Sequence, residues 1–188
     1  MRKVLIGFFV VLAIFLAIVL LFSLKRPTII KKRAAKPVQQ IPMTIASPSF
    51  ENNSLIPSKY TCEGANINPP LLFGSIPPKA KSIALVVTDP DAPGGTFTHW
   101  IIYNMPSTTT KIDENSVPAD SQEAQNSFGK KEYGGPCPPS GTHHYIFTLY
   151  ALDSIISIPD EADVSDIEKV IQSNSLEQAT LTGLYAKQ

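Results

Sequence analysis

The chain has 188 residues, and its 16 Lys and Arg residues balance 16 Asp and Glu residues, so its formal net charge is zero. That balance gives no electrostatic reason to expect a nucleic acid as partner, and the length allows one ordinary domain with extensions. The 17 prolines are spread along the chain, which is typical of a loop-rich globular fold and not of a disordered tail.

The amino-terminal part contains an uncharged apolar run. Residues 4–24 read VLIGFFVVLAIFLAIVLLFSL. At about 1.5 Å per residue, a helix of this length crosses a hydrocarbon core of about 30 Å. A cleavable signal has a shorter apolar centre and small residues at the cut, and no clear A-x-A site follows here. We therefore expect residues 1–24 to be an uncleaved single-pass membrane anchor, with a removed signal as the alternative.

The orientation of this anchor stays open, because basic residues lie on both sides of it. Arg2 and Lys3 precede the apolar run, and six Lys or Arg residues follow it between positions 25 and 36. The positive-inside rule alone would keep the following domain in the cytoplasm, whereas a short basic start before an apolar run is also how export begins. We prefer an extracytoplasmic domain. Residues 25–44 read as a basic linker, and residues 45–188 as the folded domain.

Three apolar, β-branched segments within that domain predict strands, over residues 82–89, 97–105 and 145–152. Their nearly continuous apolar character predicts central strands that are covered on both faces. Residues 179–186 also read as extended. Together these segments predict a mostly β fold, an antiparallel β-sandwich.

One helix is expected late in the chain, over residues 163–174, with Asp163 or Ser165 as its cap. Apolar residues recur there at helical spacing, at Val164, Ile167, Val170 and Ile171. The helix would be appended to the sandwich.

All three histidines lie in two stiff, charge-poor stretches, DPDAPGGTFTHW (89–100) and GGPCPPSGTHHY (134–145). Asp89 ends a predicted strand, and Pro90 stiffens the turn after it. Alone, such a turn only caps its own amides, and a single strand histidine is usually packed or solvated. However, His99 and His143 both adjoin Pro/Gly-rich connections, so we expect them at one rim of a sheet. Two imidazoles and a carboxylate that fixes a tautomer suit a phosphate or carboxylate ligand.

Other chemistries fit less well. His143 and His144 are adjacent in an expected strand and would point to opposite faces, so they would not easily share a metal. The motifs of zinc proteases, serine hydrolases, nucleotide-binding loops and dinucleotide sites are absent. We therefore expect no catalytic residue, metal or cofactor, and a metal-dependent hydrolase is the least favoured function. Cys62 and Cys137 form no C-x-x-C pair, and their spacing allows either a disulfide or two free thiols.

Four blocks resemble the phosphatidylethanolamine-binding protein family, and above all its bacterial and archaeal Raf-kinase-inhibitor-like branch. They are YTCEGANINPPLLF, DPDAPGGTFTHWIIYNMP, NSFGKKEYGGPCPPSGTHHYIFTLYALD and ATLTGLYAK, in the family's order. The resemblance spans about residues 45–188 and implies a β-sandwich with a small anion-binding pocket at one end. It places seven residues at that pocket: Asp89, Pro90, His99, Gly135, Pro136, His143 and Tyr145.

The resemblance also implies roles for these residues. His99 and His143 would donate to the anion, Asp89 would orient an imidazole, the Gly135 region would offer backbone amides, and Tyr145 would add a hydroxyl or a wall. The implied function is a non-enzymatic module that binds a small phosphorylated or anionic group. The alternative is an inhibitor-type module that binds a protein such as a kinase or protease. His144 stands where the family usually has arginine, and a membrane span is not a general family feature.

Overall fold

The computed structural model describes residues 14–20 and 41–187, and residues 41–187 belong to one compact unit. Residues 14–20 are helical and exposed. Within the described ranges, no helix combines the length and the apolar character that crossing a bilayer requires. Most of the anchor expected over residues 1–24, and of the linker expected over residues 25–44, lies outside the described residues. Both therefore stay predictions.

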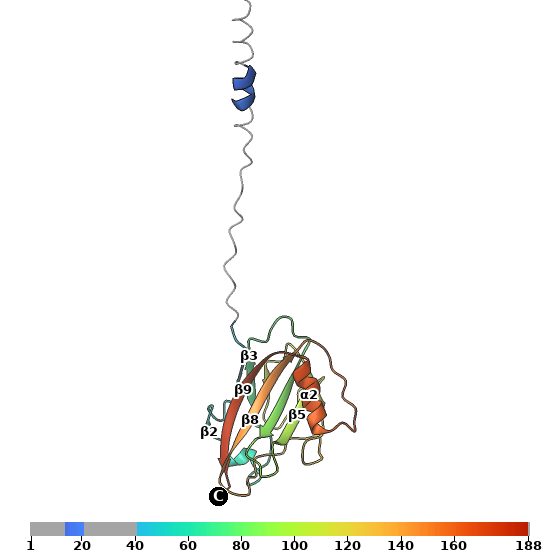
Figure 1. The fold of residues 1–188 in the computed structure, drawn as a ribbon. Helices are drawn as coiled ribbons and strands as arrows, with labels where there is room; N and C mark the ends of the chain where they lie inside the picture. Colours follow the sequence, from blue (N-terminus) through green and yellow to red (C-terminus); the bar gives the residue numbers. More distant parts are fainter. Residues whose placement is uncertain (1–13, 21–40, 188) are drawn as a thin grey trace, which may run out of the picture. The chain divides into compact units, whose positions relative to one another are not determined.

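The folded unit is mostly β, as predicted, and its strands form two sheets (Figure 1). The larger sheet has the order β2 (Ser54–Leu55), β9 (Ser175–Ala186), β8 (Thr142–Leu152), β4 (Ser82–Asp89), β5 (Phe97–Pro106) and β7 (Gln122–Glu123). The smaller sheet has the order β1 (Thr44–Ala46), β3 (Leu71–Gly74) and β6 (Lys111–Ile112). The strand pairs are antiparallel except β2 with β9, which is parallel and departs from the expected antiparallel pattern. A 3-10 turn, η1, covers Ser58–Tyr60.

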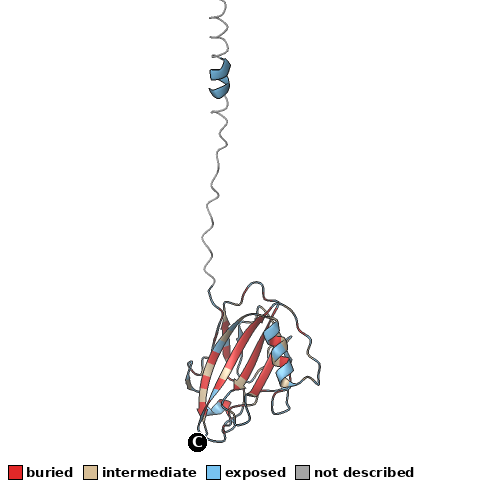
Figure 2. Ribbon diagram, in the orientation of Figure 1, coloured by how far each residue is buried: buried red, intermediate tan, exposed pale blue. Residues whose placement is uncertain are grey.

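The central strands separate two apolar cores, which explains why their sequences read as continuous apolar runs. Alternate side chains of β4 enter the core between the sheets (Ile83, Leu85, Val87) or the core on the opposite face (Ala84, Val86). Helix α2 (Val164–Ser173) covers that opposite face with its buried Ile167 and Ile171. In Figure 2 the central strands are buried and the outer side of α2 is exposed. The prediction of strands covered on both faces, with a late helix, is confirmed.

One strand boundary and one capping contact differ from the sequence-based expectation. Strand β8 begins at Thr142, so His143 and His144 lie inside the strand and not before it. Asp163 occupies the N-cap position of α2, but its side chain makes no capping hydrogen bond. Its backbone carbonyl accepts hydrogen bonds from the amides of Asp166 and Ile167 instead.

Candidate functional site

The candidate site lies where β4 ends and the neighbouring strand β8 begins. Asp89 is the last residue of β4, and His143 is the second residue of β8. Nδ1 of His143 donates to Oδ2 of Asp89 across 2.7 Å, and the two side chains are only 9% and 5% exposed. The other carboxylate oxygen of Asp89 accepts the backbone N–H of Asp91 at 2.8 Å. Asp89 therefore stiffens its own turn and orients an imidazole.

A β-bulge brings His99 to the same place. Val87 pairs with Trp100 and Thr88 pairs with Thr98, so His99 is an extra residue in β5. Trp100 belongs to the core between the sheets, whereas Thr98 bonds Glu168 of α2 on the other face. The extra residue thus breaks the usual alternation, as bulges beside functional sites do. The ring of His99 lies edge-on to Tyr145, 5.2 Å between centroids.

The hydrogen bonds of the two imidazoles fix which nitrogen carries the proton. Nδ1 of His99 lies 2.7 Å from the carbonyl oxygen of Gly134, and a carbonyl can only accept. Nδ1 of His143 faces the Asp89 carboxylate in the same way. When neutral, each ring therefore carries its hydrogen on Nδ1 and a bare lone pair on Nε2. Neither Nε2 atom makes a hydrogen bond within the described residues.

Burial shifts the pKa values of two groups at the site, His99 and Tyr145. It lowers the pKa of His99 below its ordinary value, although the Gly134 carbonyl and the Asp89 charge act in the opposite direction. Burial, and then the charge of Asp89, raises the pKa of Tyr145, so its phenol stays neutral. The Tyr145 hydroxyl is buried and has no hydrogen-bond partner among the described residues. Such an orphan donor costs stability unless a ligand engages it.

Four of the seven predicted residues line one cavity of about 200 Å³, called the polar cavity below: Asp89, His99, His143 and Tyr145. Its remaining wall is apolar and consists of Ala92, Pro93, Phe97, Phe128, Cys137, Pro138 and Pro139. The ring of Phe97 packs edge-on against the rings of His99 and Phe128. The residues that sequence reasoning missed are those of this apolar wall.

The other three predicted residues do not line the polar cavity. Pro90 is exposed, whereas Gly135 and Pro136 are buried against residues 60–66. The Gly135 amide donates to Oδ1 of Asn66 at 2.8 Å, so it does not offer itself to an anion as expected. A Cβ on Gly135 would lie 2.5 Å from the carbonyl oxygen of Tyr60, which explains the need for glycine here. Gly135 and Pro136 thus anchor the loop that carries part of the cavity wall to residues 60–66.

A disulfide joins Cys62 to Cys137, which answers the question that the spacing left open. It ties the wall residue Cys137 to the segment after η1, and the amide of Cys62 also donates to the carbonyl oxygen of Pro136. The wall of the polar cavity is therefore cross-linked to a distant part of the sequence.

The similarity to known proteins covers the folded domain of the chain. The family model described as phosphatidylethanolamine-binding protein matches residues 46–186. The chain belongs to this family. A UPF0098 protein of Methanothermobacter thermautotrophicus is 41% identical over 150 residues, which covers 77% of this chain and 99% of that protein. LppC of Mycobacterium tuberculosis, whose name includes the word lipoprotein, is 41% identical over 146 residues, covering 77% of this chain and 72% of LppC.

Solved structures of family members have the same fold. YbcL of Escherichia coli matches with a TM-score of 0.74 at 27% identity, over 79% of this chain and all of that one. The homologue CT736 of Chlamydia trachomatis matches with a TM-score of 0.73 at 34% identity, over 78% of this chain and 99% of that one. The resemblance to this family's bacterial and archaeal branch is thereby confirmed.

This member of the family carries a second histidine–aspartate pair outside the cavity. Nδ1 and the backbone N–H of His144 both contact Oδ2 of Asp91, at 2.7 and 2.8 Å. These side chains are 52% and 41% exposed. The two hydrogen bonds from His144 hold the pKa of Asp91 below its ordinary value. Consecutive residues of β8 thus face opposite sides, as predicted for His143 and His144.

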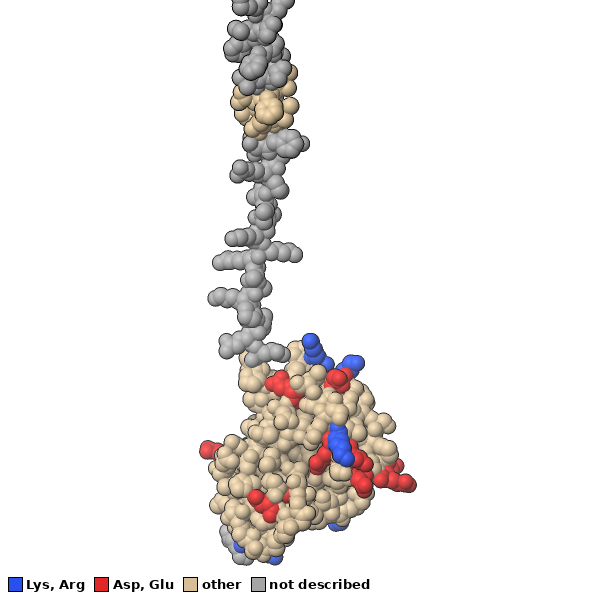
Figure 3. All heavy atoms as spheres, in the orientation of Figure 1, with Lys and Arg blue, Asp and Glu red and all other residues tan. Residues whose placement is uncertain are grey.

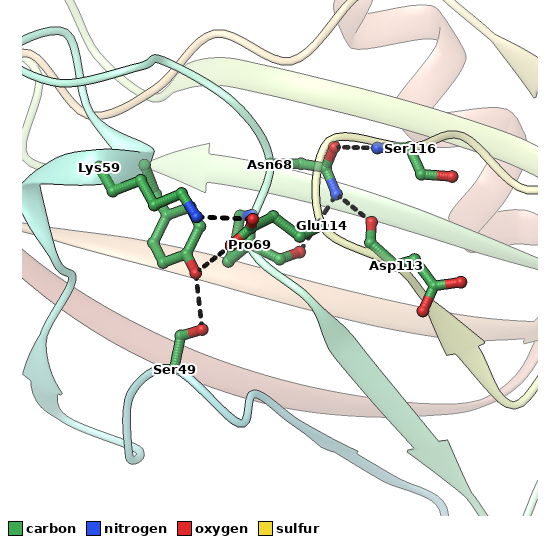
Figure 4. A network of polar contacts seen from close by, with 8 residues as sticks. Ser49, Lys59, Asn68, Pro69, Asp113, Glu114 and Ser116 are labelled. Atoms are coloured by element: carbon green, nitrogen blue, oxygen red, sulfur yellow. Dashed lines mark hydrogen bonds and ion pairs between the residues drawn. The ribbon is translucent and has the colours of Figure 1, made fainter.

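A polar network fixes the segment that carries Cys62 (Figure 4). Glu114 accepts hydrogen bonds from Lys59 and Tyr60, each at 2.6 Å. The amide of Asn68 donates to the carbonyl oxygens of Pro69 and Asp113, and its Oδ1 accepts from the amide of Ser116. This network joins the segment around residues 59–69 to residues 113–116. It therefore supports the loop to which the cavity wall is cross-linked.

The remaining surface offers less chemistry. A larger cavity of about 310 Å³ adjoins Trp100 and Glu123, but none of the predicted site residues lines it. Within the described part of the chain, no group of three or more His, Cys, Asp or Glu residues is arranged to hold a metal. The face drawn in Figure 3 is mainly uncharged, with few Lys and Arg side chains.

Proposed function

We propose that the domain is a non-enzymatic binding module and that its polar cavity takes a small anion, above all phosphate or a phosphoryl group. The observation that carries this proposal is the meeting of two buried imidazoles and an unpartnered phenol around one cavity. A protonated imidazole and a neutral hydroxyl are both suitable donors to an oxyanion. The volume of about 200 Å³ is ample for a phosphate.

Binding is coupled to a proton in this proposal. Both Nδ1 hydrogens are already donated, to Gly134 and to Asp89, so two neutral rings would present only lone pairs. Lone pairs repel an anion, and the Asp89 carboxylate adds a negative charge nearby. Apart from the Tyr145 hydroxyl, a hydrogen bond to the anion therefore requires either a protonated ring or an anion that carries a proton of its own, as hydrogen phosphate does.

Binding is preferred to catalysis because the lining of the polar cavity includes no Ser, Thr, Lys or free thiol that could act as a nucleophile. Each oxygen of Asp89 already accepts a hydrogen bond, one from His143 and one from the Asp91 amide. In this proposal Asp89 orients the imidazole of His143 for binding.

We also propose that the domain is exported and associated with a membrane. The disulfide is a feature of oxidising compartments, and the apolar run over residues 4–24 is long enough for an anchor. The lipoprotein name of the relative LppC points in the same direction. Protease added to intact cells is expected to digest the domain, and full protection of the domain would contradict this placement.

The binding proposal is tested by titrating inorganic phosphate into the full chain and into single variants. His99→Ala and His143→Ala are each expected to weaken binding about 10- to 100-fold, because each removes a charge-assisted hydrogen bond. His144→Ala is the matched control, since it removes the neighbouring histidine on the opposite face and is expected to leave the affinity unchanged. Equal phosphate affinity in all four proteins, or no binding in any, would refute the proposal.

A further inference from the structure

A groove of about 280 Å³ lies along helix α2 and the segment that leads into it. None of the residues that line the polar cavity lines this groove. Its apolar lining comes from that segment and from the helix itself: Ile158, Pro159, Ala162, Ile167 and Val170. The carboxylates of Glu161 and Asp166 complete the lining. We call it the α2 groove.

The segment that forms one side of the α2 groove is fixed by hydrogen bonds. The side chain of Asn104 donates to the carbonyl oxygen of Ile156 at 2.8 Å and accepts the amide of the same residue at 3.0 Å. The amide of Ala162 donates to the carbonyl oxygen of Pro159, which closes a turn beside the helix. The groove is therefore formed before any partner binds, and a partner would not have to order it.

The surroundings of the α2 groove are acidic. Five acidic residues and one lysine lie between positions 157 and 170. Lysines neutralise two of the five, Asp160 and Asp166. Glu161, which lines the groove, makes no hydrogen bond or ion pair within the described part of the chain. Figure 3 shows acidic side chains gathered over the part of the surface where Figure 1 places α2. The groove thus combines an apolar lining with a net negative charge.

We propose that the α2 groove is a docking site for a protein partner, and that it takes a peptide segment in which one or two apolar side chains are flanked by Lys or Arg. A cavity of about 150 Å³ is enough to hold benzene, so the groove accommodates apolar side chains. The flanking cations would meet Glu161 and the other carboxylates, as charges do across complementary interfaces. The proposal uses no residue of the phosphate site and does not depend on it.

Other occupants fit the charge of the α2 groove less well. In a two-fold contact, a second copy of the chain would place the same acidic residues opposite one another, and like charges across an interface are unfavourable. A nucleic acid or an anionic lipid surface would be repelled for the same reason. A basic peptide with apolar side chains satisfies both the lining and the charge.

Three synthetic peptides test the proposal on the full chain by calorimetric titration: KKLLKK, KKSSKK and EELLEE. KKLLKK is expected to bind about tenfold more tightly than KKSSKK, because its leucines lose contact with water in the groove. EELLEE is expected not to bind, because its charges have the same sign as those of the groove. Equal binding of KKLLKK and KKSSKK, binding of EELLEE as tight as that of KKLLKK, or binding of none of the three would overturn the proposal.

Glu161→Lys and Glu51→Lys are a matched pair of variants, because both side chains are exposed and only Glu161 lines the groove. Glu161→Lys is expected to weaken KKLLKK binding about threefold to tenfold, and Glu51→Lys to leave it unchanged. An equal loss in both variants would show attraction to net charge alone and would overturn the proposal. A dimer of the parent chain that Glu161→Lys alters, followed by sedimentation, would assign the groove to a second copy and overturn it as well. Thermal unfolding verifies that both variants fold.

Discussion

Asp89 and His143 are 54 residues apart in the sequence, yet they form a buried hydrogen-bonded pair at the end of the larger sheet. The pair joins the last residue of β4 to the start of β8 and fixes the tautomer of an imidazole that lines the polar cavity. Because the carboxylate lies opposite Nδ1, protonation of the ring at Nε2 would create a charged pair that is already aligned.

Replacing Asp89 by Asn tests this relationship. The amide is expected to stabilise a protonated His143 poorly, so phosphate affinity should fall about 10- to 100-fold, and unfolding free energy should fall by about 1–3 kcal/mol. Asp91→Asn is the matched control, because its exposed contact with His144 is worth less than about 1 kcal/mol. Calorimetric titration and denaturant unfolding measure both quantities. Equal phosphate affinity in the two variants would contradict this role for Asp89.

The orphan hydroxyl of Tyr145 predicts opposite effects on stability and on binding. Tyr145→Phe removes a buried polar atom without a partner, so the free protein is expected to become more stable by up to about 1–3 kcal/mol. The same change removes a donor from the polar cavity and should weaken phosphate binding. Unfolding is measured with and without phosphate. A variant that is less stable when free, or that binds phosphate as well as the parent protein, would show that the hydroxyl has another role.

The stability of the free domain should fall on acidification because of His99. Burial lowers its folded pKa below the unfolded value of about 6.5, so below that pH the unfolded chain binds more protons. The unfolding free energy is therefore expected to decrease as the pH falls from about 6.5 toward the folded pKa of His99. His99→Gln should lose this part of the pH dependence. Melting temperatures measured across this range decide the matter, and identical pH profiles for the two proteins would contradict it.

Sulfate and phosphate distinguish whether the proton in the hydrogen bond to the anion comes from the imidazole or from the anion itself. Sulfate carries no proton near neutral pH, so it needs a protonated imidazole, whereas hydrogen phosphate can donate to a neutral Nε2. At about pH 8 we expect phosphate to bind and sulfate to fail, and at about pH 5.5 we expect both to bind. Titrations at the two pH values measure this. Sulfate binding of equal strength at both would show that the two Nδ1 hydrogen bonds do not control the site.

Loss of the disulfide should affect both the fold and the cavity. The bond closes a loop with a sequence separation of 75, for which loop entropy alone predicts about 4 kcal/mol of stabilisation. The double variant Cys62→Ser/Cys137→Ser is expected to unfold at lower denaturant concentration and to bind phosphate more weakly. Chemical reduction of the parent protein is the matching control and should lower stability in the same way. An unchanged unfolding midpoint in the variant would contradict this expectation.

The parts of the fold that the sequence predicts best are those with long, unambiguous patterns. Strands β4 and β5 are short, rich in β-branched and aromatic residues and bounded by turn residues, and α2 repeats apolar residues at helical spacing. The smaller sheet was missed because its strands have only two to four residues, too few to show a period. The parallel pairing of β2 with β9 was missed for the same reason.

At the site, local rules identified the residues but could not identify their partners. Alternation along a strand correctly placed His143 and His144 on opposite faces, but nothing local assigns Asp89 to one and Asp91 to the other. The bulge at His99 and the bond from Gly135 to Asn66 depend on contacts between distant segments. Phe128 was passed over because an isolated phenylalanine in a loop has no pattern that marks it as part of a wall.

The two histidine–aspartate pairs have a joint consequence. The Asp89–His143 pair is buried, whereas the Asp91–His144 pair, formed by the same turn and the same strand, is exposed to solvent. The exposed pair therefore serves as an internal reference for the effect of burial on a histidine–aspartate hydrogen bond. Ring signals of the inner and outer histidines, followed side by side in one sample, would report that difference free of any change in fold, temperature or ionic strength.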